Sequence, residues 1–187
     1  MLIELASQGR QVVRLKGGDP FIFGRGGEEA EALAAAGISF SVVPGISAMS
    51  GVAASCSIPL THRDHADQLR VITGHCCNNN SLDCDWHDLA RTKQTVVFYM
   101  GLSNLNEIAA ELIAAGAPAS RPAALVANAT RDNERVIIST LDSLPDLAAR
   151  TEVKSPALII IGDVVAVRAR LVIENDDVKD LLVSATA

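Results

Sequence analysis

Residues 14–29 read RLKGGDPFIFGRGGEE and bring five glycines and a proline into one short segment. The apolar run QVVRL (11–15) at its start predicts a buried strand, and GGEEAEALAAAG (26–37) predicts a helix. An acidic first turn and a closing glycine support that helix. We therefore expect the glycine-rich loop at the carboxyl end of a strand, where open α/β sheets usually bind ligands.

The chemistry of this loop has two interpretations from the residues alone. Glycines let backbone N–H and C=O groups approach a ligand with no Cβ in the way. However, GGDP and GRGG match neither the Walker phosphate loop nor the GxGxxG pattern. Two tight turns without a ligand are the alternative, so both interpretations stay open at this point.

The rest of the chain alternates apolar, β-rich runs with alanine-rich stretches. This pattern is typical of α/β architecture with largely parallel sheets. An irregular connection, IPLTHRDHADQ (58–68), predicts a boundary between domains 1–68 and 69–187. The acidic tail (174–187) is expected to be loose or to form a docked helix. The further predicted strands are 39–45, 69–75, 94–101, 122–130, 134–140 and 155–165, and the further predicted helices are 46–56, 104–117 and 143–150.

The composition limits the classes of function. The 187 residues are 49% hydrophobic, enough for a substantial core. No apolar run approaches the roughly 20 residues of a membrane span, and MLIELASQGR lacks the features of a signal peptide, so we expect a cytoplasmic protein. A net charge of -6 argues against nucleic acid as a partner. An anionic ligand would have to be held by local arginines.

The cysteines and histidines indicate neither disulfides nor a metal site. The four cysteines lack a framework spacing, so we expect reduced thiols. Adjacent cysteines without a CxxC pair fit structural zinc spacing poorly. The cluster considered comprises His75, Cys76, Cys77, Cys84 and His87.

Five motifs follow one another along the chain: VVRLKGGDPFIFGRGGEE, VVPGISA, IPLTHRD, KQTVVFYMGL and SPALIIIGDVV. In this order they resemble the uroporphyrinogen-III C-methyltransferases of the tetrapyrrole methylase family, above all the methyltransferase module of siroheme synthase. The resemblance implies two α/β domains with the active site in the cleft between them. It also implies transfer of methyl groups from S-adenosylmethionine to C-2 and C-7 of uroporphyrinogen III. The product would be precorrin-2, on the siroheme and cobalamin branch, made by a homodimer without a metal.

The resemblance also implies which residues contact S-adenosylmethionine. Asp19 is a candidate acceptor for a ligand hydroxyl, and the flexible thioether of Met100 suits an irregular apolar contact with cofactor and substrate. Ala129 occupies a position that is glycine in some relatives. The cofactor-binding residues expected are Gly17, Gly18, Asp19, Ile22, Ser47, Ala48, Met100 and Ala129.

Substrate recognition needs cations, because uroporphyrinogen III is rich in carboxylates and arginine forks bind carboxylates bidentately. The resemblance implies catalytic roles for Arg25 and Glu28, and substrate contacts from Arg25, Arg63 and Met100. The alternative for Arg25 and Glu28 is a surface i,i+3 ion pair at a helix start. For His62, we expect a loop histidine bonded to backbone and leave it outside the site.

This sequence lacks one part of the family pattern. Relatives begin with a strand and a GxGPGD-type loop, whereas residues 1–10 match the end of the helix before the VVRL strand. We therefore expect a first domain without its early strands, with an open sheet edge and exposed apolar surface. Two hypotheses follow: the methyltransferase itself, with little or no activity from this chain alone, or a catalytically inactive binding or assembly module.

Overall fold

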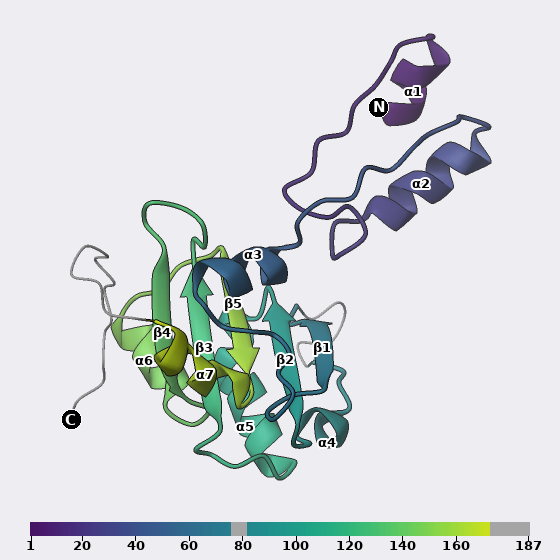
Figure 1. Ribbon diagram of the computed structural model, residues 1–187. Helices are drawn as coiled ribbons and strands as arrows, with labels where there is room; N and C mark the ends of the chain where they lie inside the picture. Colours follow the sequence, from purple (N-terminus) through teal and green to yellow (C-terminus); the bar gives the residue numbers. More distant parts are fainter. Residues whose placement is uncertain (76–81, 173–187) are drawn as a thin grey trace. The chain divides into compact units, whose positions relative to one another are not determined.

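The computed structural model of the chain describes residues 1–75 and 82–172 (Figure 1). The chain divides into two compact units, Met1–Ala48 and Met49–Ala187. We call them unit 1 and unit 2. The predicted tail at 174–187 lies outside the described residues.

Unit 1 contains two helices and no strand among its residues, all of which are described. Helices α1 (Leu2–Ser7) and α2 (Gly26–Ala35) contact each other, which confirms the helix predicted at 26–37. The strands predicted at 11–15 and 39–45 are wrong, because both segments have irregular backbone. A strand needs a ladder partner, and unit 1 supplies none for either segment.

Unit 2 is built on a five-stranded sheet in the order β1-β2-β5-β3-β4. Only the β1–β2 pairing is parallel, so the expectation of a largely parallel sheet is wrong. The reason lies in the chain path: β3 and β4 form a hairpin, and the crossover that follows returns β5 in the reversed direction, between β2 and β3. The strands are β1 (Gln68–Thr73), β2 (Gln94–Tyr99), β3 (Pro122–Ala127), β4 (Arg135–Thr140) and β5 (Ala157–Ile161).

Helices cover both faces of this sheet (Figure 1). Side chains alternate along β2, so Val96 and Phe98 enter one apolar cluster and Val97 enters the other. The first cluster is closed by α4, α5 and α6, and the second by α3 and α7. These helices are α3 (Ala48–Ser55), α4 (Trp86–Leu89), α5 (Leu105–Ala114), α6 (Leu144–Arg150) and α7 (Val164–Leu171); a 3₁₀ turn (Leu102–Asn104) precedes α5. No described helix is both long enough and apolar enough to cross a membrane.

The division between the units falls earlier in the chain than the expected boundary at 68/69. Residues that follow Met49 pack on the sheet: Val52, Cys56 and Ile58 are at most 3% exposed and join the cluster of α3 and α7. This burial ties the segment before β1 to unit 2. The strand predicted at 155–165 also ends sooner, at Ile161, because α7 begins at Val164.

Candidate functional site

The glycine-rich loop of unit 1 folds back on itself in compact turns. The N–H of Gly26 donates to the carbonyl oxygen of Pro20 at 2.9 Å. A Cβ on Gly24 or Gly26 would lie 2.7 or 2.5 Å from that oxygen, so neither position has room for a side chain. Arg25 between them has a left-handed backbone with φ of 58°. The loop therefore depends on its glycines for its shape.

The Asp19 carboxylate ties this loop to a second segment of unit 1. Its Oδ1 accepts the N–H of Phe21 at 2.9 Å, and its Oδ2 accepts the N–H of Gly45 at 3.1 Å. A Cβ on Gly45 would lie 2.9 Å from the Gly18 oxygen, so the two backbones approach closely. Asp19 thus holds the loop as well as being a candidate ligand acceptor, and each of its oxygens keeps a further lone pair.

This contact brings most of the unit 1 candidates together. Ser47 and Ala48 follow Gly45 at the start of α3, next to the GGDP loop, and Ser47 is 8% exposed. An ideal Cβ on Gly17 would meet nothing within 4 Å, and Ile22 is 38% exposed. The same loop of unit 1 therefore presents open backbone at Gly17 and a partly exposed apolar side chain at Ile22.

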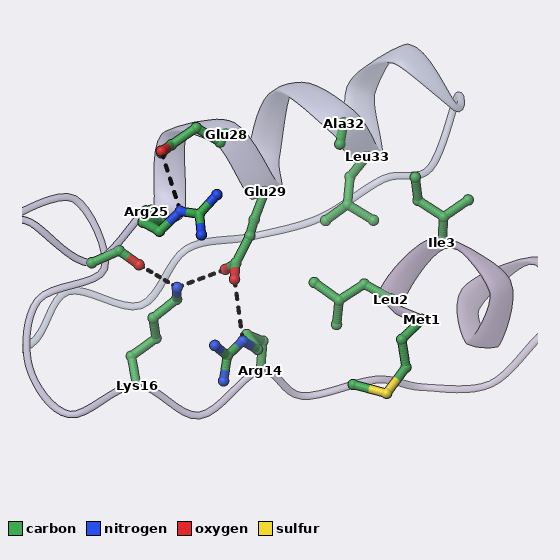
Figure 2. A pocket seen from close by; sticks show the side chains of 11 residues that line it. Met1, Leu2, Ile3, Arg14, Lys16, Arg25, Glu28, Glu29, Ala32 and Leu33 are labelled. Carbon is green, nitrogen blue, oxygen red and sulfur yellow. Dashed lines mark hydrogen bonds and ion pairs between the residues drawn. The ribbon is translucent and has the colours of Figure 1, made fainter. Parts of the chain in front are cut away.

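Arg25 and Glu28 lie at the start of α2 with their side chains in solvent (Figure 2). Arg25 Nε lies 3.5 Å from Glu28 Oε1, and the side chains are 82% and 64% exposed. This geometry is the i,i+3 surface pair expected as the alternative. It also leaves the guanidinium and the carboxylate open to a ligand, because exposed pairs are held weakly.

An ion network beside them, absent from the sequence interpretation, involves Arg14, Lys16 and Glu29 (Figure 2). Lys16 Nζ lies 2.7 Å from Glu29 Oε2 and also donates to the Gly24 carbonyl oxygen. Arg14 Nε lies 3.2 Å from Glu29 Oε1. The hydrogen bond from Lys16 is the main cause that lowers the pKa of Glu29 below its ordinary value. The sequence signals this ion network only through Arg14 and Lys16, two cations at alternate positions just before the loop.

The network borders a pocket of about 400 Å³ within unit 1 (Figure 2). One end of the pocket carries the charged groups described above. The other end is apolar and is formed by α1 and α2, with Met1, Leu2, Ile3, Ala32 and Leu33.

Two candidate residues of unit 2 lie at one edge of its sheet. Met100 follows the end of β2 and Ala129 follows β3; both strands run antiparallel to β5, so they end at the same edge. Met100 has φ of 55° and is 52% exposed, while Asn128 and Thr130 have φ of 53° and 65°. Left-handed backbone at residues other than glycine is costly and concentrates at functional sites. The structure thus brings Met100 and Ala129 to one strained edge.

Arg63 lies elsewhere in unit 2. It is exposed within the turn closed by the His62–Ala66 bridge. A few residues later, the Asp67 N–H donates to the Lys93 oxygen at 3.0 Å, where β2 begins. The structure therefore does not bring Arg63 to the edge of Met100. Near it, His62 Nδ1 accepts the N–H of Asp64 at 3.2 Å, which confirms the backbone-bonded histidine.

The cluster of cysteines and histidines that was weighed as a zinc site is only partly described. Cys76 and Cys77 lie outside the described residues. Within 1–75 and 82–172, no group of three or more His, Cys, Asp or Glu side chains could hold a metal ion.

Comparison with known proteins identifies the family. Residues 1–145 match the tetrapyrrole (corrin/porphyrin) methylases. The chain belongs to the tetrapyrrole methylase family. As a tetrapyrrole methylase it is similar to the siroheme synthase of Pseudomonas aeruginosa, with 55% identity over 171 residues. This match covers 91% of the chain and 37% of the relative, so the chain spans little more than a third of that protein.

Solved structures of tetrapyrrole methylases confirm the predicted α/β fold of the family. A uroporphyrin-III C-methyltransferase of Thermus thermophilus is 39% identical with a TM-score of 0.77, over 92% of this chain and 73% of that one. A structure of a uroporphyrin-III C-methyltransferase from Thermus thermophilus complexed with S-adenosylhomocysteine is 36% identical with a TM-score of 0.74, over 89% of this chain and 72% of that one.

Proposed function

We propose that this chain serves the S-adenosylmethionine-dependent C-methylation of uroporphyrinogen III at C-2 and C-7, which gives precorrin-2. One observation carries the proposal: the GGDP loop is folded with Arg25 and Glu28 exposed beside it, in a chain 39% identical to a solved uroporphyrin-III C-methyltransferase. A relative that binds S-adenosylhomocysteine supports the choice of methyl donor, since that molecule is what remains after methyl transfer. The product would enter siroheme or cobalamin synthesis.

The residues of unit 1 fit a methyl donor of this kind. Gly17 leaves its backbone open, Asp19 keeps lone pairs for ligand hydroxyls, and Ile22 offers apolar contact. When bound, the donor supplies a methyl group on a sulfonium, which is already a strong electrophile. The residues we assign to it are Gly17, Gly18, Asp19, Ile22, Ser47 and Ala48 from unit 1, with Met100 and Ala129 from unit 2.

The substrate side of the proposal rests on charge and on proton removal. The exposed guanidinium of Arg25 would bind a substrate carboxylate bidentately. C-2 and C-7 already carry side chains, so methyl transfer to either carbon leaves a positive charge on the macrocycle, and a proton lost from another atom of the ring system removes it. Glu28 is an exposed carboxylate beside Arg25, and we assign it as the acceptor of that proton. Met100 would provide apolar contact. For Arg63, the family resemblance is the sole support.

A binding or assembly module is the second candidate. It is favoured by the exposed apolar side chains of unit 1, such as Val13 and Leu15 at 83%, which are suited to contact with another chain segment. We further propose a cytoplasmic homodimer, and the net charge of -6 supports the absence of a nucleic-acid partner.

An anaerobic assay separates these candidates. The chain is mixed with uroporphyrinogen III and S-adenosylmethionine, and the absorbance of oxidised precorrin-2 is followed. We expect little or no turnover from this chain alone, so turnover within tenfold of a full-length relative would support the enzyme and contradict that expectation. The same assay on a chain that also carries the early strands of its relatives separates the candidates: turnover there supports the enzyme, and binding of S-adenosylhomocysteine without turnover supports the inactive module.

The role of Arg25 is tested in the full-length protein. We expect Arg25→Ala to lower kcat/KM for uroporphyrinogen III by about thirtyfold, because a charge-assisted bond to a carboxylate is lost. Affinity for S-adenosylhomocysteine should stay within about twofold. Arg10→Ala, an exposed arginine outside the loop, is the control. Equal losses of both quantities would show that Arg25 supports the loop rather than the substrate.

A further inference from the structure

Lys16 stands out within unit 1 because its charged group is largely enclosed. Its side chain is 12% exposed, against 53% for Arg14 and 82% for Arg25. The Nζ has two oxygen partners, the Gly24 carbonyl and Glu29 Oε2 at 2.7 Å (Figure 2). A lysine ammonium is strongly hydrated, so its enclosure requires such partners.

The two partners belong to different parts of the site. Lys16 directly precedes Gly17, where the loop begins, and Gly24 directly precedes Arg25, where it ends. The hydrogen bond from Lys16 to Gly24 therefore closes the base of the loop 17–24. The second bond anchors this base to α2 through Glu29, which follows Glu28.

We propose that Lys16 is a positioning residue that clamps the base of the loop 17–24 and thereby sets the placement of Arg25 and Glu28. A loop rich in glycine has many backbone states in the absence of such restraints. Charge-assisted hydrogen bonds to both ends remove much of that freedom before a ligand arrives. The consequence for methyl-donor binding rests on the function proposed above; the clamp itself does not.

Arg14 provides a matched control for this proposal. It also pairs with Glu29, at 3.2 Å, but its other hydrogen bond goes to the carbonyl of its neighbour Leu15. Among the described contacts, Arg14 thus shares the ion pair without reaching across the loop. A comparison of Lys16→Met with Arg14→Met separates the clamp from a plain ion pair on α2.

The experiment measures two quantities on the 187-residue chain. Hydrogen exchange of the Gly26 amide, which bonds to Pro20 within the loop, reports loop closure by NMR. Calorimetry reports the affinity for S-adenosylhomocysteine. We expect Lys16→Met to speed the exchange and to weaken the affinity, each by about tenfold. Arg14→Met should change either by less than about twofold.

Two further variants keep the test decisive. Lys16→Arg should restore most of both quantities, because a guanidinium can donate to the carbonyl and the carboxylate. Glu29→Gln keeps the bond from Lys16 to Gly24, so it should speed Gly26 exchange by less than about threefold. If circular dichroism shows that Lys16→Met does not fold, Lys16→Gln takes its place in the comparison, because it also removes the ammonium but keeps a polar side chain.

The outcomes are distinct. Equal effects of Lys16→Met and Arg14→Met, no effect of Lys16→Met, or strong loss of Gly26 protection in Glu29→Gln each overturn the clamp. A chain that binds no S-adenosylhomocysteine, while Lys16→Met alone speeds Gly26 exchange, contradicts the proposed methyl donor and supports the clamp.

Discussion

Two apolar runs of similar composition adopt different backbone structures in the two units. QVVRL in unit 1 has irregular backbone and leaves Val13 and Leu15 83% exposed. QTVVFY in unit 2 forms β2 and buries Val97 completely. The difference lies in their neighbours, since β2 is paired on both sides, by β1 and β5. A strand-like pattern therefore becomes a strand only where the remaining chain provides its ladder.

The same contrast governs where stability resides. Unit 2 has apolar clusters on both faces of its sheet. In unit 1 Gly26 is the one buried residue before Ser47. Because the hydrophobic effect follows the apolar area removed from water, unit 2 should supply nearly all of the free energy of unfolding.

A matched pair of leucines tests this contrast most strongly. Leu125 in β3 is fully buried, whereas Leu15 is 83% exposed. We expect Leu125→Ala to lower the free energy of unfolding by about 2–5 kcal/mol through lost burial and a cavity. Leu15→Ala should change it by less than about 0.5 kcal/mol. Urea denaturation followed by circular dichroism measures both, and comparable losses would show that unit 1 buries its apolar surface in solution.

The Cys56 thiol tests the burial of α3 against the sheet at alkaline pH. Burial, aided by Glu134, raises the pKa of this thiol to about 11 from an ordinary 9.0. The unfolded chain therefore loses the proton first, so this contribution to stability is complete below pH 9 and is lost as the pH rises to about 11. Urea midpoints should fall more steeply over this range for the wild type than for Cys56→Ala. Parallel slopes would mean that Cys56 is open to water.

The smallest expected effect concerns Glu29 in unit 1. The hydrogen bond from Lys16 is the largest cause that lowers the pKa of Glu29 from 4.5. The associated stability is present above pH 4.5 and is lost as the pH falls through the lowered value. NMR titration should find the Glu29 midpoint below 4.5, and Lys16→Met should raise it. A midpoint that Lys16→Met leaves unchanged would contradict the pairing in solution.

The sequence predicted elements well where local pattern and tertiary partners agree. The helices near 26–37, 46–56, 104–117 and 143–150 and all five strands of unit 2 were placed close to their observed positions. Strand direction could not be predicted in this way, because it depends on where β5 inserts, which is a long-range pairing. Helix α7 was missed because its first residues, Val164 and Val165, continue the apolar run of β5.

The candidate site was predictable in its residues more than in its contacts. Glycine content located the loop, and the motif order located Arg25 and Glu28. The bond between Asp19 and Gly45 and the enclosure of Lys16 were not predictable, because each joins a loop residue to a partner that only the fold brings near. The roles of these residues in binding remain predictions.

The place of β5 in the sheet has a consequence for biosynthesis. Among the strands in residues 1–75 and 82–172 it comes last along the sequence, yet it lies at the centre of the sheet, between β2 and β3. While a ribosome is still synthesising residues before Ala157, the emerging chain can form only the β1–β2 pair and the β3–β4 hairpin, and small separate pairs of strands are marginally stable in water. The sheet can close only after Ile161 has left the exit tunnel, so unit 2 folds late, and until then its apolar strands stay exposed, which favours aggregation.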